Sequence, residues 1–329
     1  MDICLDKLPP QSRMLVSVSG GADSIYLIWF LSQYVSPDQL RLVYFDHGLR
    51  APSEIETDIQ CIKKIQVQIQ IKHFKTIALS VKSYAKHHML SIETSARQLR
   101  RFHLVQYARQ HSCDYIAMGH HLDDHIETFF LQLIRGTKSQ LKGISKQTHY
   151  QGISIIRPLL GMSKQDILMQ LDRLNIDYSS DQTNLDLQFS RNKLRHQMIP
   201  VLAEVNSNYR TQIAAFISYF KQTQSFILDH LSPFLSEVQF DSHSIILPDR
   251  IFNLLGSLFL KQNWIRYSIQ TYINEYAPNS FNAFPQIDEI HIQSISQLFS
   301  KPKRKQTSLP FPFFCVKQND HVCIYVKID

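Results

Sequence analysis

Six residues near the start of the chain, Ser19-Gly-Gly-Ala-Asp-Ser24, combine residue types that can bind phosphate. The apolar run Met14–Val18 precedes them and the apolar run Ile25–Leu31 follows, which predicts a buried strand, a tight turn and a helix. A helix N-terminus carries free N–H groups and a partial positive charge, so it suits an anion. Ser19 and Ser24 add hydroxyl donors. The segment predicts a phosphate loop; the alternative is a plain strand-to-helix turn with Ser and Asp caps.

Two features of this segment make the phosphate reading more specific. The chain has only nine glycines, and Gly20-Gly21 is the one adjacent pair, which indicates a backbone that needs positive φ or a close approach. Asp23 places a carboxylate beside the expected phosphates, and the two would repel each other unless a cation lay between them. The sequence therefore predicts a Mg²⁺ site that includes Asp23.

A second cluster, His120-His-Leu-Asp-Asp-His-Ile-Glu-Thr128, follows the apolar run Asp114–Gly119. Asp124 and Glu127 are three residues apart and share a helix face. This cluster, together with Asp123 in the same helical turn, favours Mg-ATP chemistry. The alternatives are ordinary acids at a helix N-terminus with surface histidines, or a metal site alone, although zinc normally takes differently spaced His and Cys ligands.

Asp46 ends a third apolar run, Arg41–Asp46, where it could bind adenosine or a second Mg²⁺, or simply cap a turn. Several basic segments could bind phosphates or RNA, since arginine forks match phosphate geometry, although solvated surface is the alternative for each. They are Glu93–Arg101 with Arg97, Arg100 and Arg101; Arg135 with Lys138, Lys142 and Lys146; the polar loop Asp181–Asp186 followed by Arg191 and Arg195 on one face; and Lys301–Lys305.

The elements that must position these residues alternate between strand and helix. We expect strands over 14–18, 41–46, 67–74 and 114–119, and helices over 25–31, 53–65, 94–110 and 121–134. This order predicts an α/β fold with a mainly parallel sheet and helices on both faces. Ligands then bind at the carboxyl ends of the strands, where Gly20, Asp46 and His120 all fall.

The composition changes after about residue 205, because eight of the nine glycines precede residue 162. We expect helices over 209–235, 251–273 and 291–299, and a terminal β-hairpin formed by 312–317 and 321–327. The predicted domains are a catalytic domain over residues 1–208 and a mainly helical region over 209–329 that ends in the hairpin. A homodimer is compatible with the many Phe, Ile and Leu residues of this region, but a core explains them equally well.

Bulk composition narrows the function classes. The net charge of +7 favours a polyanionic partner such as nucleic acid. The five cysteines form no CxxC pair, which fits a reducing cytoplasm and argues against a structural zinc or iron–sulfur site. Asp2 and Asp6 interrupt the apolar character that a signal peptide needs, and no apolar run is long enough to predict a membrane span.

The segment Ser19–Ser24 lacks the Gly-Lys-Ser/Thr of the Walker loop and resembles the PP-loop of the N-type ATP pyrophosphatases. The chain resembles one family among them, the tRNA(Ile)-lysidine synthetases. Six blocks carry this resemblance through residues 14–202: Ser19–Ser24, Asp46–Arg50, Glu93–Arg101, His120–Gly136, Arg157–Leu160 and Asp181–Pro200.

The resemblance implies an enzyme that uses ATP to adenylate the C2 oxygen of the wobble cytidine in isoleucine tRNA with a CAU anticodon. The ε-amine of free lysine then displaces AMP, which gives lysidine and changes codon reading from AUG to AUA. It implies that ATP is bound by Ser19, Gly20, Gly21, Ala22, Asp23, Ser24, Asp46 and His120, and that Asp23 and Asp124 hold Mg²⁺. The catalytic residues would be Asp23, Asp123, Asp124 and Glu127, with Glu127 receiving the lysine ammonium. Arg97, Arg101, Arg135, Arg191 and Arg195 would bind tRNA or the α-phosphate, and the region 209–329 would bind tRNA.

Two departures from the family pattern stand out. Lys138 and Gln140 occupy positions where the family has small residues, and the chain is short beside members with two C-terminal domains, so no further module is expected. Three other functions remain as alternatives: a tRNA thiolase, which would need cysteines at usable spacing; a GMP or NAD synthetase-like ligase, which would not need the Asp181–Pro200 block; and a non-catalytic RNA-binding protein, which would have no need of Asp23, Asp123 and Asp124.

Overall fold

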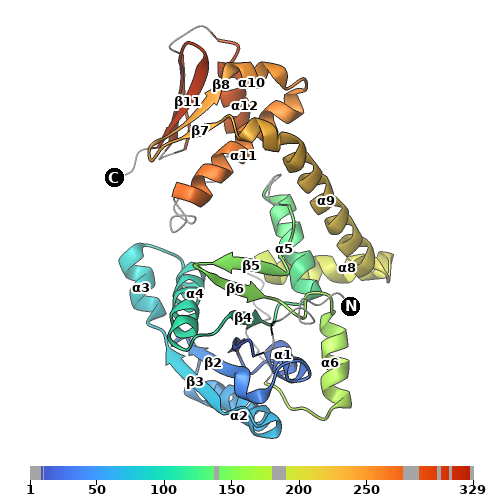
Figure 1. Ribbon diagram of the computed structural model, residues 1–329. Coiled ribbons are helices and arrows are strands. Elements are labelled where there is room, and N and C mark those ends of the chain that lie inside the picture. The colour runs from blue at the N-terminus through green and yellow to red at the C-terminus, as the bar shows by residue number, and fades with distance from the viewer. Residues whose placement is uncertain are drawn as a thin grey trace. The chain divides into compact units, whose positions relative to one another are not determined.

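The computed structural model describes residue 9 and the ranges 11–136, 141–179, 190–276, 289–301, 305–310 and 313–326. Contacts divide the chain into two compact units (Figure 1). The first consists of residues 1–131 and 143–214, and the second of residues 132–142 and 215–329. Polar residues that could do chemistry gather in the first unit.

The first unit is built on a six-stranded sheet with the strand order β3-β2-β1-β4-β6-β5. Neighbouring strands run parallel except for β5 and β6, which pair antiparallel. This confirms the predicted α/β fold and places the carboxyl ends of β1, β2 and β4 at one edge. The strands are β1 (Met14–Val18), β2 (Leu40–Asp46), β3 (His73–Ala78), β4 (Tyr115–Met118), β5 (Gln147–Tyr150) and β6 (Ile153–Ile156).

Helices cover both faces of this sheet because successive strand residues point to opposite sides. Met14 and Val16 of β1 pack in one core with α1, α2 and α6, while Leu15 packs in another core with α3 and α4. Helix α5 follows β4 directly and carries the second predicted cluster. The helices are α1 (Ala22–Ser32), α2 (Pro52–Ile69), α3 (Val81–His88), α4 (Ile92–Gln110), α5 (Leu122–Ile134) and α6 (Lys164–Arg173).

The strand predicted over 67–74 is wrong. Helix α2 continues to Ile69, because Cys61, Ile62 and Ile65 extend the apolar face that packs on the sheet. Gln70 then ends the helix in the left-handed conformation, with φ at 65°, and the strand begins only at His73. The alternation in this stretch reflects the last helical turn followed by an edge strand.

The first unit also contains a short 3-10 helix between α1 and β2 and four helical segments after α6. They are η2 (Pro37–Gln39), α7 (Ser190–Lys193), the π-helix η4 (Leu194–Met198), α8 (Ile199–Val205) and the beginning of α9 (Tyr209–Leu235). Helix α9 has the predicted bounds and runs on into the second unit.

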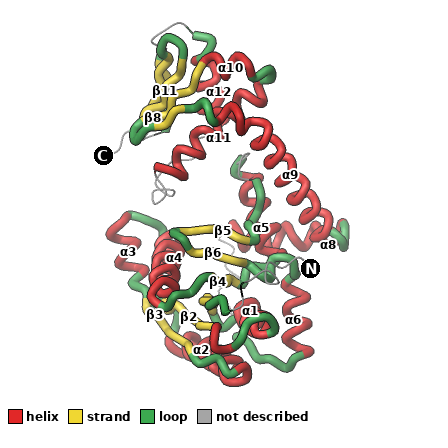
Figure 2. Tube along the Cα trace, viewed as in Figure 1, coloured by secondary structure: helices red, strands yellow, loops and turns green. Residues whose placement is uncertain are grey.

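The second unit contains a five-stranded sheet of order β7-β8-β11-β10-β9, with antiparallel neighbours. Figure 2 shows its strands in yellow beside the helices of the same unit in red. The predicted terminal hairpin is confirmed as β10 and β11, but it belongs to this larger sheet. Its other elements are β7 (Gln239–Phe240), β8 (Ser244–Pro248), α10 (Asp249–Leu254), α11 (Leu258–Tyr276), α12 (Glu289–Leu298), β9 (Gln306–Ser308), β10 (Phe313–Lys317) and β11 (His321–Val326).

The single helix predicted over 251–273 is wrong, because the chain forms α10 and α11 instead. Leu255 has an extended backbone with ψ at 105°, and Gly256 follows it. The Ser257 hydroxyl then accepts a hydrogen bond from the Leu260 N–H, as a helix cap does. Apolar periodicity continues across the break, so it conceals the break in the sequence. Among the described helices, none has the length and apolar character needed to cross a membrane.

Candidate active site

The predicted phosphate loop connects β1 to α1 and is held by its own serines. Gly20 has φ at +79°, a conformation that favours glycine, and Gly21 is the N-cap of α1. The Ser24 hydroxyl accepts a hydrogen bond from the Ser19 N–H at 3.1 Å and donates to the Gly21 carbonyl at 2.9 Å. The loop therefore presents the free N–H groups of a helix N-terminus at the edge where ligands bind.

A cavity of about 310 Å³ opens beside this loop. It lies at the carboxyl ends of β1, β2 and β4, as the parallel sheet requires. Asp46 lines it, while one of its carboxylate oxygens accepts a hydrogen bond from the Gly48 N–H at 2.8 Å, so Asp46 also caps a turn. The lining residues that bear on function are Ser19, Asp23, Ser24, Asp46, His47, Arg50, Asp58, Arg100 and His120.

Two histidines in this cavity are electrically neutral at pH 7. Burial, and to a smaller extent Arg100, lowers the pKa of His47. Burial also lowers the pKa of His120 to about 4, against the opposing effect of Asp124. The Nδ1 atoms of both rings are buried and find no hydrogen-bond partner within the described parts of the chain. Neutral rings with unused polar atoms suit a heterocyclic ligand that offers its own donors and acceptors.

Three aspartates converge on His121, which is buried at the start of α5. The Nε2 atom of His121 lies 3.7 Å from Asp23 and 3.4 Å from Asp124, and its Nδ1 atom lies 3.7 Å from Asp123. Burial alone would raise the pKa of Asp124, but His121, Arg191 and His120 outweigh it and hold the pKa below its usual value. Asp124 is therefore ionised at neutral pH.

Glu127 lies one turn further along α5 and is 1% exposed. Arg191 donates to one of its oxygens at 2.8 Å, and Arg195 donates to both at 2.6 and 3.0 Å. Arg195 also reaches a carboxylate oxygen of Asp124 at 3.3 Å. The two arginines predicted to bind tRNA thus contact the predicted catalytic acids, and their side chains remain about one-third exposed.

Two further cations contact the aspartates. Lys164, the first residue of α6, donates through its ammonium to Asp23 at 2.6 Å and through its backbone N–H to Asp123 at 2.7 Å. Arg210, near the start of α9, donates to the other oxygen of Asp123 at 2.7 Å. Asp123 therefore joins the beginnings of α5, α6 and α9, whereas Asp124 and the loop residue Asp23 lie near the same nitrogen of His121.

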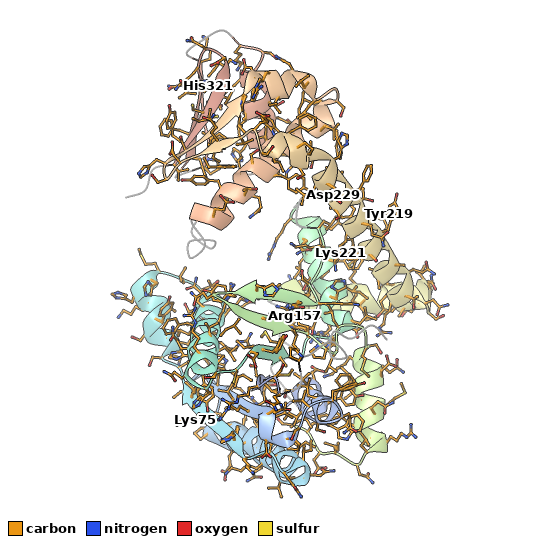
Figure 3. All side chains as sticks on the ribbon, in the orientation of Figure 1. Lys75, Arg157, Tyr219, Lys221, Asp229 and His321 are labelled. Carbon is orange, nitrogen blue, oxygen red and sulfur yellow. The ribbon has the colours of Figure 1, made fainter. Side chains whose placement is uncertain are left out.

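The remaining predicted arginines lie apart from this cluster. Arg97 is exposed and pairs with Glu93 at 3.4 Å, and the guanidinium of Arg101 lies 3.4 Å from the centre of the Tyr150 ring. Arg135 is exposed in the turn after α5. Arg157, directly after β6 (Figure 3), donates to the Ser145 carbonyl. The block Asp181–Asp186 and Lys138 lie outside the described residues.

Sequence reasoning did not assign several site residues that the fold brings in. Arg100 lines the cavity, although the sequence placed it only among the basic helix positions. His121 had a signal in the sequence, because it is half of a His-His pair at a strand end. Lys164, Arg210 and Asp58 had none, since each lies in an unremarkable helical stretch.

Comparison with known proteins agrees with this loop and sheet. The family model described as "PP-loop domain" matches residues 3–202, so the chain belongs to the PP-loop family. The match covers the six strands of the first unit and the carboxylates of the candidate site, which are Asp23, Asp46, Asp58, Asp123, Asp124 and Glu127.

Among individual proteins, the chain is 28% identical over 315 residues to a tRNA(Ile)-lysidine synthase of Bacillus cereus, covering 93% of this chain and 63% of that protein. It is 33% identical over 224 residues to the tRNA(Ile)-lysidine synthase of Thermosipho africanus, covering 67% of this chain and 51% of that protein. The chain thus spans less than two thirds of the length of these relatives.

A solved structure, the U34-tRNA thiolase NcsA from Methanococcus maripaludis with its 4Fe-4S cluster, aligns with a TM-score of 0.53. The identity is 18%, over 67% of this chain and 75% of that one. At this identity the likeness shows the fold alone.

Proposed function

We propose that the protein is an ATP-dependent ligase that joins lysine to C2 of the wobble cytidine in isoleucine tRNA with a CAU anticodon. The observation that carries the proposal is the convergence of Asp23 from the phosphate loop with Asp124 and Glu127 from α5, beside the half-buried arginines Arg191 and Arg195. The consistent naming of the relatives as tRNA(Ile)-lysidine synthases supports the same reaction.

ATP would occupy the cavity beside the phosphate loop. The loop residues Ser19–Ser24 and the N-terminus of α1 would receive the phosphates, and the neutral rings of His47 and His120 would face the nucleoside. Arg100 adds a positive charge to the same cavity. These groups would hold the α-phosphorus for attack by the cytidine oxygen, with pyrophosphate as the leaving group.

The residues present fit a Mg²⁺ ion that arrives with ATP. Asp23 and Asp124 each place a carboxylate oxygen within 3.7 Å of the same His121 nitrogen. No group of three or more His, Cys, Asp and Glu residues in the described ranges forms a metal site by itself. Mg²⁺ commonly binds one or two carboxylates and takes its other ligands from phosphates and water, and there it would offset the charge of the departing pyrophosphate.

Lysine and the cytidine would meet beside Asp124. The carboxylate of Asp124 is ionised and close to the loop, so it can attract the lysine ammonium or the metal. Glu127 remains the predicted acceptor of the lysine ammonium. Its carboxylate also pairs with Arg191 and Arg195 and holds both guanidinium groups in position. Those guanidinium groups would stabilise negative charge on the α-phosphate as the adenylate forms and as AMP departs.

The tRNA would approach over the exposed basic side chains, which include Arg97 and Arg135, and the net charge of +7 favours such a partner. We place this activity in the cytoplasm with its tRNA substrate. A homodimer remains a prediction. The buried apolar residues of the second unit form the core of that unit, so they do not by themselves support a dimer interface.

The proposal is tested by incubating the protein with ATP, Mg²⁺, radiolabelled lysine and unmodified isoleucine tRNA with a CAU anticodon. We expect ATP-dependent label on the RNA, and no label when the wobble cytidine is replaced by uridine. AMP formation without label would indicate another nucleophile or RNA, and the absence of both would favour a non-catalytic RNA-binding protein.

A variant separates catalysis from RNA binding. Asp23→Ala removes the loop carboxylate that would hold Mg²⁺, so we expect label incorporation to fall at least about hundredfold. Affinity for tRNA, measured by filter binding, should change less than about twofold, because Asp23 contacts Lys164 and His121 rather than the basic surface. Unchanged activity in this variant would contradict the Mg²⁺ role of Asp23.

A further inference from the structure

A buried carboxylate, Asp58, lies behind the phosphate loop and was not among the predicted site residues. It belongs to α2 and is 1% exposed. Its oxygens accept hydrogen bonds from the Tyr44 hydroxyl at 3.0 Å, Arg50 at 2.6 Å and the Ser179 hydroxyl at 2.5 Å. These donors come from β2, from the loop after β2 and from the chain after α6. One side chain therefore joins three separate segments.

Asp58 also contacts the loop directly. A Cβ atom on Gly20 would lie 2.7 Å from both the Cα and the Cβ atoms of Asp58, so the loop backbone rests against this residue without a gap. Ser179, which donates to Asp58, also donates its backbone N–H to the Gly20 carbonyl at 2.9 Å, and it forms a β-bridge with Gly21. The two glycines are held by Asp58 on one side and on the other by a serine that Asp58 fixes.

A negative charge at this place opposes the binding of phosphate unless it is compensated. Arg50 supplies the compensation through its ion pair with Asp58. A buried ion pair is weak evidence for stability, because apolar residues of similar volume commonly serve as well. Three donors on one carboxylate do, however, fix the orientation of the groups that they belong to.

We propose that Asp58 is a positioning residue that sets the conformation of the phosphate loop through Gly20 and Ser179. The inference rests on the proposed function in one respect, namely that this loop receives the phosphates of ATP. It predicts a selective defect: loss of the Asp58 contacts weakens binding of the phosphates more than binding of the nucleoside, because Asp58 contacts the loop backbone at Gly20 directly but reaches the end of β2 only through the Tyr44 hydroxyl.

The experiment compares ATP with adenosine as ligands of the full chain, by calorimetry. The variants are Asp58→Asn, which keeps the shape of the side chain, and Ser179→Ala, which keeps the backbone contact to Gly20. We expect the dissociation constant for ATP to rise about tenfold in both variants, and the constant for adenosine to change less than about twofold. Asp177→Asn is the matched control, because its exposed pair with Lys64 lies two residues from Ser179.

Circular dichroism identifies the variants that are folded at the temperature of the measurement, and Ser179→Ala carries the test if Asp58→Asn does not fold. Equal losses of ATP and adenosine affinity would overturn the proposal, since they would mean general damage to the cavity. Unchanged affinity for both would also overturn it while leaving the proposed function intact. Failure of the unaltered protein to bind ATP would overturn the positioning role of Asp58 and the proposed function together. This measurement is made first, before any variant is prepared.

Discussion

Four acidic side chains around His121 and on α5 have cationic partners. Lys164 pairs with Asp23, Arg210 with Asp123, and Arg191 and Arg195 with Asp124 and Glu127. At Asp124, His121, Arg191 and His120 outweigh the effect of burial and hold the pKa below its usual value, so this carboxylate stays ionised. The hydrogen bonds in these pairs also orient the acids.

Replacement of Glu127 by Gln should strongly destabilise the first unit. It would leave the guanidinium groups of Arg191 and Arg195 with Asp124 as a remaining acidic partner, so we expect the free energy of unfolding to fall by about 2–3 kcal/mol. Urea titration of the full chain, followed by circular dichroism, measures the change. The control is Glu93→Gln, whose pair with Arg97 is exposed on both sides and should contribute less than about 1 kcal/mol. Equal effects of the two changes would contradict the argument.

The lowered pKa of His120 predicts how the free energy of unfolding depends on pH. Its pKa is lowered from 6.5 to about 4 in the folded protein, so the unfolded chain binds the extra proton between those values. The contribution of neutral His120 to the free energy of unfolding is fully present above pH 6.5. As the pH falls from 6.5 toward 4, this contribution decreases by about 1.4 kcal/mol for each pH unit. His120→Gln should lose less stability than the unaltered protein over this range. A parallel loss in both, by urea titration at several pH values, would exclude the effect.

At the scale of elements, the site is assembled from the first turns of helices. The N-termini of α1, α5 and α6 bring Asp23, Asp124 and Lys164 together, and α9 begins beside them with Arg210. These side chains lie close together because their helices start at the same edge of the sheet. The position of a helix start therefore decides the position of a functional group.

Ser163 tests this dependence. Its hydroxyl accepts a hydrogen bond from the Asp166 N–H and caps α6, directly before Lys164. Ser163→Ala should lower the free energy of unfolding by about 1 kcal/mol. Because Lys164 then loses its fixed position, lysine incorporation should fall as well. Ser91→Ala removes the equivalent cap of α4 and should cost similar stability without reducing lysine incorporation; an equal loss of lysine incorporation in both variants would contradict the role of α6.

At the scale of the whole molecule, 35 Lys and Arg against 28 Asp and Glu give a net positive charge, which attracts the negatively charged RNA. Release of counter-ions makes such binding steeply dependent on salt. Arg97 is 69% exposed on its side chain and is placed to contribute, whereas Arg191 and Arg195 are occupied by Glu127.

Affinity for tRNA should therefore fall with rising salt, and Arg97→Gln should reduce the slope of log affinity against log salt concentration by about one. Filter binding between low and physiological salt measures both quantities. Lys72→Gln is the control, since Lys72 is equally exposed and paired with Asp38 but lies outside the predicted basic segments. An identical change of slope in both variants would show that only the net charge matters.

The sequence by itself determined the phosphate loop, the α/β class and the acids at the strand ends, because these depend on local patterns. A buried strand followed by Gly20-Gly21 and a helix start predicts a strand, a tight turn and a helix, and the carboxyl ends of parallel strands must meet. The strand predicted from the apolar alternation over 67–74 was wrong. The last turn of α2 and the edge strand β3 together produce this alternation, and the packing of α2 decided where the helix ends.

Only the tertiary structure decided which charges meet. Lys164 lies 141 residues from Asp23, and Ser179 lies 121 residues from Asp58, and neither partner carries a local signal. The arginines at 191 and 195 were recognised as basic, but their engagement with Glu127 depends on how α7 and η4 fold back onto α5. Pairing of this kind is set by the path of the chain through space, which spacing along the sequence does not contain.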